Sequence, residues 1–238
     1  MAISAGPFET VLLAELRLGL PPVFYWRLYE IEDDWAFILK LHSLFEGALT
    51  RLVKEKLTLR EIRQENLTPY DSFFSRVQLA DRLELLDPDY KNYFLSLNHL
   101  RNDITHNIRH INLRLPAYFD SLAENDFRRA TRGLGAGFKN LPLDLAQALK
   151  PLLKLKKSKH TPKTVRDLFM CLWPKFTIWH SGIYALDLIS LHFHFEMTGD
   201  SVCQEAEMEA KLQDLLLDPE VITFKKKLAK KLGGSGSN

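Results

Sequence analysis

Residues 95–113 read LSLNHLRNDITHNIRHINL and are the most informative stretch of this 238-residue chain. Apolar residues recur here, and just before it, at spacings of three and four, which predicts one helix with a buried stripe. Asp87-Pro88-Asp89 is typical of the start of such a helix. Three histidines and two arginines lie close together off the stripe, which is unusual for a soluble helix. The stripe comprises Tyr93, Phe94, Leu97, Leu100, Ile104, Ile108 and Ile111.

The rest of the chain also predicts helices, and no strand pattern stands out. A long apolar segment, 164–197, contains Pro174, which predicts a kink or two helices. The glycines of 131–137 predict a turn or mobile loop. We therefore predict an all-α fold, a helical bundle. Its other helices are expected at about 8–18, 33–56, 73–86, 117–131, 143–155, 201–217 and 219–232.

The composition is that of an ordinary globular protein, with 46% hydrophobic and 26% charged residues and a net charge of +2. The two cysteines, Cys171 and Cys203, lie far apart, which argues against a disulfide framework or zinc cluster and favours the cytoplasm. No uncharged apolar run reaches roughly 18 residues, so we expect no membrane span. Because no Gly-rich phosphate loop, nucleophile elbow or paired-carboxylate site is present, no cofactor or metal is expected.

Positive charge is concentrated between residues 128 and 166, where eleven basic residues meet one acid, Asp144. A surface that follows a phosphate backbone needs such charge, although a lysine-rich stretch is often only solvated. The lysines of 225–231 form a smaller cluster, which the acidic helix at 201–217 is expected to neutralise. The residues that we assign to nucleic-acid binding are Arg109, Arg128, Arg129, Arg132, Lys139, Lys156, Lys157 and Lys159.

Arg101, Asn102 and His106 form the pattern R-N-x-x-x-H. Asn102 and His106 are four residues apart and share a helical face, whereas Arg101 is offset from Asn102 by about 100°. Histidine exchanges protons near neutral pH, and arginine binds phosphate oxygens and stabilises charge that builds up on them. These residues suit metal-independent RNA cleavage, in which the 2′-hydroxyl of the RNA is the nucleophile.

Further histidines and one acid are assigned supporting roles. His99 and His110 extend the face of His106. His42 and Glu46, four apart on the helix at 33–56, form a polar pair that either lies at the solvated rim or supports the histidine-rich helix. A metal site made of the three clustered histidines is an alternative that their spacing allows.

The run Arg101-Asn102-Asp103-Ile104-Thr105-His106, on a helix of an all-α chain, resembles the R-x4-6-H motif of the HEPN superfamily. The resemblance covers about residues 31–115. It implies a homodimeric endoribonuclease in which Arg101 and His106 are catalytic, Asn102 supports them, and two copies of the motif meet across the interface. It also implies RNA as the substrate and a prokaryotic defence role, as in toxin–antitoxin or abortive-infection systems, and leaves room for an inhibitory or activating protein partner.

Two other functions remain open: a non-catalytic HEPN-like module that binds RNA, nucleotides or a partner protein, and a structural interaction protein whose motif arises by chance. The expected organisation is an N-terminal arm at 1–30, a HEPN-like domain at 31–199 with a basic insert at about 114–165, and C-terminal helices at 200–232. Residues 233–238, GGSGSN, are interpreted as an artificial linker.

Overall fold

The computed structural model describes residues 6–59, 72–106, 112, 114–139, 151, 158–198 and 202–233. Every regular element in these ranges is a helix, which confirms the all-α prediction. In chain order the helices are α1 (Pro7–Leu18), α2 (Phe24–Glu30), α3 (Asp34–Leu59), α4 (Phe73–Arg82), α5 (Pro88–His106), α6 (Leu115–Ser121), α7 (Glu124–Leu134), the 3-10 helix η3 (Ala136–Phe138), α9 (Val165–Leu172), α10 (Pro174–Thr198), α11 (Val202–Leu216) and α12 (Pro219–Gly233).

The helix α5 begins as its sequence predicts. The Asp87 carboxylate accepts the backbone N–H groups of Asp89 and Tyr90 at 2.9 and 3.0 Å, which satisfies two donors of the first turn. The predicted stripe is buried from Tyr93 to Ile104. The helix ends at His106 in the described residues, and Asn112 lies in a turn. Ile108 and Ile111 fall outside the described residues.

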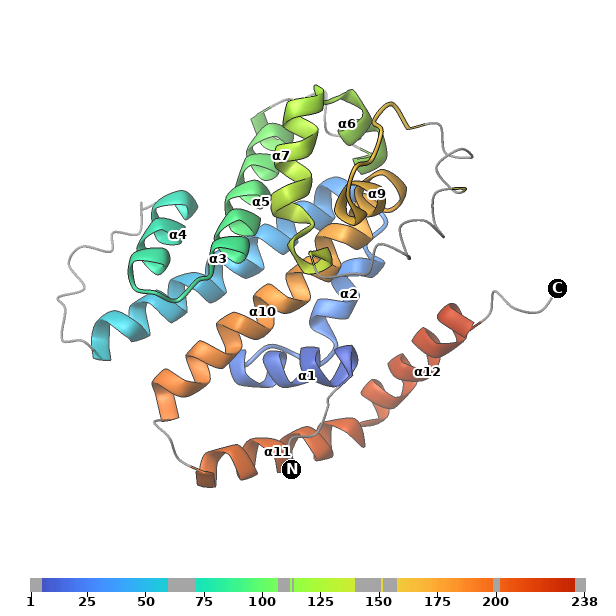
Figure 1. Cartoon of the computed structure of the whole chain (residues 1–238). Coiled ribbons are helices and arrows are strands. Elements are labelled where there is room, and N and C mark those ends of the chain that lie inside the picture. Colours follow the sequence, from blue (N-terminus) through green and yellow to red (C-terminus); the bar gives the residue numbers. More distant parts are fainter. Residues whose placement is uncertain are drawn as a thin grey trace.

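The long helix α10 packs against α1, α3 and α5 in the main core (Figure 1). The Tyr25 hydroxyl donates to the Trp179 carbonyl at 2.7 Å, and the Tyr93 hydroxyl donates to the Ile178 carbonyl at 3.0 Å. These bonds fasten α2 and α5 to α10. The predicted break at Pro174 is confirmed, because α9 ends at Leu172 and α10 begins at that proline.

The turn or mobile loop predicted for 131–137 is correct only at Gly135, which lies in a turn. The helix α7 continues through Gly133 to Leu134, and η3 begins at Ala136. A Cβ atom at Gly133 would lie 2.0 Å from Ser96 Oγ and 2.7 Å from the Asn92 carbonyl. Glycine is therefore needed at this position for the close approach of α7 to α5, and burial of the helix outweighs the low helix propensity of glycine.

The helix α4 ends at Arg82, four residues before its predicted end. Glu84 has a φ of 61°, a conformation that interrupts a right-handed helix. Leu85 and Leu86 are nevertheless buried. The apolar pattern therefore predicted their burial correctly but predicted the wrong backbone conformation.

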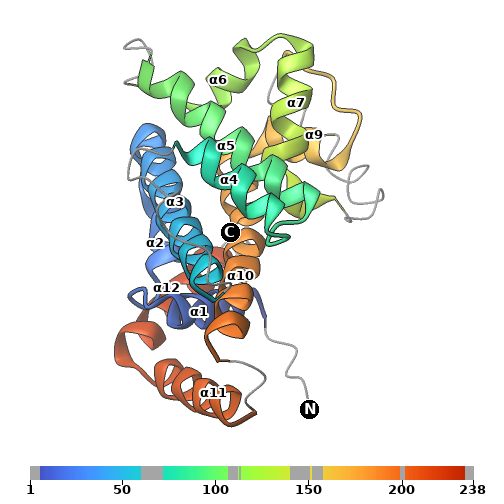
Figure 2. The same ribbon diagram turned by 90° about the vertical axis from the view of Figure 1, so that its left-hand side faces the viewer.

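The C-terminal helices pack on α1 at the end of the molecule opposite α6, α7 and α9 (Figures 1 and 2). In Figure 1, α12 leads away from α11 instead of folding back along it. Lys225 pairs with Glu9 of α1 and Lys227 with Glu30 of α2, both at 2.9 Å. Acids of the N-terminal helices therefore neutralise Lys225 and Lys227. No helix in the described ranges has the length and apolar character of a membrane span.

Candidate functional site

Arg101 lies on the edge of α5 that faces α3. One turn earlier on this edge, the Asn98 side-chain oxygen accepts a hydrogen bond from His42 Nε2 at 3.2 Å. The Arg101 guanidinium donates through Nη1 to the Asn102 side-chain oxygen at 3.0 Å. Thr105 Oγ1 donates to the Arg101 carbonyl at 3.0 Å. Asn102 is therefore bonded to Arg101, which makes it an orienting partner of the guanidinium.

The predicted pair His42 and Glu46 joins three helices. Glu46 Oε1 accepts from Arg76 of α4 at 2.7 Å, and Glu46 Oε2 lies 3.8 Å from His42 Nδ1. Burial lowers the pKa of His42, and the positive charge of Arg101 lowers it further. The hydrogen bond to Asn98 and the charge of Glu46 raise the pKa, but their combined effect is smaller. Because its side chain is buried, His42 is held neutral beside α5 and is not a rim residue.

Arg76 and Asn98 complete this network, and neither was predicted. Asn98 precedes Arg101 by three residues, so helical spacing alone places the two on one edge and was a usable signal. Arg76 lies on a separate helix, thirty residues from Glu46 in the sequence. Its contact depends on how α4 packs on α3, and no local pattern reveals it.

His106 is solvent-exposed at the last described turn of α5. Five residues separate it from Arg101, which corresponds to about 140° around a regular helix. Around the helix axis, Asn102 lies at an angle between those of Arg101 and His106. Within one chain, therefore, the arginine and the histidine of R-N-x-x-x-H leave the helix axis in different directions.

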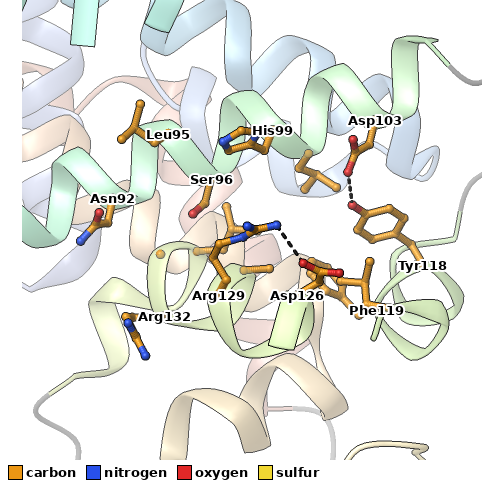
Figure 3. Close-up of a pocket in the computed structure, with 15 residues that line it drawn as sticks. Asn92, Leu95, Ser96, His99, Asp103, Tyr118, Phe119, Asp126, Arg129 and Arg132 are labelled. Carbon is orange, nitrogen blue, oxygen red and sulfur yellow. Dashed lines mark hydrogen bonds and ion pairs between the residues drawn. The ribbon is translucent and has the colours of Figure 1, made fainter. Parts of the chain in front are cut away.

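His99 lies on a different edge of α5, where it borders a groove of about 450 Å³ between α5 and α7 (Figure 3). Tyr118 of α6 and the arginines Arg129 and Arg132 of α7 line the same groove. The Tyr118 hydroxyl donates to Asp103 Oδ2 at 2.6 Å. The pKa of Tyr118 is raised mainly by burial and, to a smaller extent, by this hydrogen bond. The structure thus brings His99 together with two predicted nucleic-acid-binding arginines and separates it from Arg101.

Several of the predicted nucleic-acid-binding residues pair with acids that precede the basic span. Arg128 pairs with Glu124, Arg129 with Asp126 at 2.8 Å, and Lys139 with Asp89 at 2.5 Å. Lys159 donates to the Leu122 carbonyl at 3.4 Å. These acids lie outside the range 128–166, so counting charges within that range alone did not include them. The local positive field is therefore weaker than predicted. Arg109, His110, Lys156 and Lys157 lie outside the described residues.

His160 is a buried residue of the basic insert that sequence reasoning did not single out. Its Nδ1 lies 2.9 Å from Glu124 Oε2, its Nε2 lies 2.9 Å from the Phe119 carbonyl, and its ring stacks on Phe127 with centroids 4.0 Å apart. The ring therefore anchors the segment at 158–164 to α6 and α7. A lone histidine in a lysine-rich stretch carries no sequence signal for such a role.

Comparisons with known proteins find no matching family model, no matching curated protein and no matching solved structure. The HEPN resemblance therefore stays a prediction from the R-N-x-x-x-H motif. The function has to be argued from α5 and the side chains that surround it.

Proposed function

We propose that this protein is a metal-independent endoribonuclease of HEPN type that acts as a homodimer. The observation that carries the proposal is the hydrogen bond between Arg101 and Asn102, on the same helix as the exposed His106. A guanidinium fixed by a neighbouring amide is preorganised to bind a phosphate. The proposed setting is the cytoplasm of a prokaryotic cell, in a defence or toxin role.

The angular separation of Arg101 and His106 supports a site made from two chains. The two side chains leave α5 about 140° apart, so one helix presents them in different directions. A second copy of α5 facing the first would bring Arg101 of one protomer toward His106 of the other. The proposed active site is therefore shared between protomers.

In the proposed reaction the RNA supplies its own nucleophile. His106 of one protomer takes the proton of the 2′-hydroxyl, and the 2′-oxygen attacks the adjacent phosphorus. Arg101 stabilises the charge that develops on the phosphate oxygens, with Asn102 holding its guanidinium. The bond from phosphorus to the 5′-oxygen breaks, and a second histidine or water protonates that oxygen. The products are a 2′,3′-cyclic phosphate and a 5′-hydroxyl.

The cleavage assay uses single-stranded RNA in excess EDTA. Wild-type protein should cut it, whereas Arg101→Ala and His106→Ala should each lose at least about a hundredfold in rate, as expected for the loss of a charge-stabilising group or a general acid–base group. Arg82→Ala, which removes an exposed arginine from the end of α4, is the matched control and should cut normally. RNA methylated at every 2′-oxygen should resist cleavage. Cleavage of the methylated RNA, or by both α5 variants, would exclude this mechanism.

The shared site is tested by mixing inactive variants. An equal mixture of Arg101→Ala and His106→Ala proteins should regain part of the activity, because a mixed dimer retains one of each side chain in opposite chains. A strictly monomeric mass at micromolar concentration would contradict the shared site. RNA binding without cleavage would instead favour the non-catalytic module.

A further inference from the structure

His160 is buried against α6 and α7, and both nitrogens of its ring face hydrogen-bond acceptors. Its side chain is 2% exposed. Nδ1 lies 2.9 Å from Glu124 Oε2, and Nε2 lies 2.9 Å from the Phe119 carbonyl oxygen. A carbonyl oxygen can only accept a hydrogen bond, so Nε2 carries a proton. Whether Nδ1 carries one as well depends on the state of Glu124.

The surroundings of Glu124 keep its carboxylate ionised. Its Oε1 accepts from the Arg128 guanidinium, and its side chain is 47% exposed, so water solvates it too. The hydrogen bond from His160 lowers the pKa of Glu124, and the bond from Arg128 lowers it further. An ionised carboxylate can only accept, so Nδ1 of His160 carries a proton as well. With both nitrogens protonated, the ring is a positively charged imidazolium.

The aromatic contact of His160 also favours the charged form. The ring stacks on Phe127, with 9° between the ring planes and 4.0 Å between the centroids. A cation is attracted to the face of an aromatic ring. A neutral imidazole would keep the stacking contact but lose this attraction. Its unprotonated Nδ1 would also present a lone pair to the Glu124 carboxylate, where no hydrogen bond could form.

His160 is the buried attachment point of segment 158–164, which has no regular secondary structure. Every other residue of this segment is half-buried or exposed. Ser158 Oγ donates to Asp120 Oδ1 at 3.0 Å, and Lys159 Nζ donates to a carbonyl between α6 and α7 at 3.4 Å. Because these two bonds lie nearer the surface, water competes for them. The fixed position of this end of the segment therefore depends mainly on His160.

The other end of the segment is attached through the start of α9. Asp167 Oδ2 accepts the backbone N–H groups of Lys163 and Thr164 at 2.9 and 3.0 Å, and the Thr164 side chain caps the helix. These bonds do not involve an imidazole. The charged groups of the contact region around His160 are Asp120 of α6, Glu124 and Arg128 of α7, Lys159 of the segment itself and Asp167 of α9.

We propose that His160 makes the attachment of segment 158–164 dependent on a proton. As an imidazolium, the ring donates to Glu124 and to the Phe119 carbonyl at the same time and holds the segment on α6 and α7. Loss of the proton removes the bond to Glu124, and the segment loosens at its His160 end. Because imidazole exchanges its proton near neutral pH, the attachment is firm on the acidic side and weakens as the pH rises. This device does not depend on whether the protein cuts RNA.

The test combines two measurements on the full chain between pH 6 and pH 9. NMR of protein labelled with nitrogen-15 in its histidine rings reports the protons on His160, whose signals are identified by their loss in His160→Phe. Limited trypsin digestion reports detachment, because cleavage after Lys159 needs the segment to leave α6 and α7. Its rate is divided by the rate for the same bond in a free peptide at the same pH. Both nitrogens should be protonated at pH 6, and the normalised rate should rise about tenfold or more as the ring loses its proton, as expected for the loss of one charge-assisted hydrogen bond.

Two variants of α7 separate this device from general effects of pH. Glu124→Gln should flatten the pH dependence, because an amide can accept from a protonated Nδ1 or donate to an unprotonated one. Asp126→Asn removes a neighbouring acid that pairs with Arg129 and should respond to pH like wild type. The proposal is overturned if His160 is neutral at pH 6, if it keeps its proton to pH 9, or if the normalised cleavage rate does not follow its titration. An equal pH dependence in Glu124→Gln and Asp126→Asn would overturn it too.

Discussion

Gly182 occupies a crowded position in the core, and its substitution by alanine tests how α5 is held. An added Cβ atom would lie 2.1 Å from the Tyr25 hydroxyl and 2.7 Å from the Tyr93 hydroxyl. Both hydroxyls donate to carbonyls of α10 within the preceding turn. The absence of a side chain at this position therefore lets both tyrosines reach the backbone of α10.

Opposing effects determine the sign of the Gly182→Ala change. Alanine is favoured over glycine in a helix interior by about 1 kcal/mol. Overpacking a rigid core costs about 1–3 kcal/mol. Displacing two buried hydroxyls from their acceptors costs about 1–3 kcal/mol for each hydroxyl left unsatisfied. The destabilising contributions are larger, and because they overlap we expect a net loss of about 2–5 kcal/mol.

The assay is urea denaturation of Gly182→Ala in the wild type and in a Tyr25→Phe/Tyr93→Phe background. In that background the nearest remaining atom is Phe45 Cζ at 3.3 Å, so the alanine should cost less than about 1 kcal/mol. Gly47→Ala is the control: its added Cβ meets nothing within 4 Å, so it should stabilise α3 by up to about 1 kcal/mol. An equal cost in both backgrounds would refute the steric reasoning.

Three further substitutions test buried polar groups by urea denaturation. Glu15→Gln removes one of two acceptors for the Val23 and Tyr25 N–H groups, at 2.8 and 2.6 Å, and should cost about 1–3 kcal/mol. Burial raises the pKa of Glu15 from 4.5 to about 7, so the free energy of unfolding of the wild type falls as the pH rises through 7. The difference in that free energy between wild type and Glu15→Gln should therefore shrink from pH 5 to pH 8. A difference that grows over this range would contradict the reasoning. Burial lowers the pKa of His42 below 6.5, so wild type loses stability as the pH falls below that value, and His42→Gln should flatten the dependence between pH 8 and 5.5. Among the described residues, the buried Nδ1 of His180 has no hydrogen-bond partner, and the centroid of its ring lies 4.7 Å from that of Phe138. His180→Phe should therefore raise the free energy of unfolding by about 1 kcal/mol. A lower denaturation midpoint would count against this.

Helical periodicity predicted the buried face of α5 and misplaced His99. The buried stripe of α5 and its start at Asp87 follow from residue spacing, because both depend on contacts within a few residues. His99 was grouped with His106, but in the structure it borders the groove with Arg129 and Arg132. A helix wheel orders the residues around α5, yet it does not show which neighbouring helix covers each edge.

By itself the sequence determined that the chain is helical, where α5 begins, which side of it is buried, and that Pro174 separates two helices. These features depend on local spacing and backbone chemistry. Only the tertiary structure decided that Asn98 meets His42, that Glu46 meets Arg76, and that Gly133 lets α7 approach α5 closely. These contacts join residues distant in the chain, and they form only when the apolar faces of several helices are buried together.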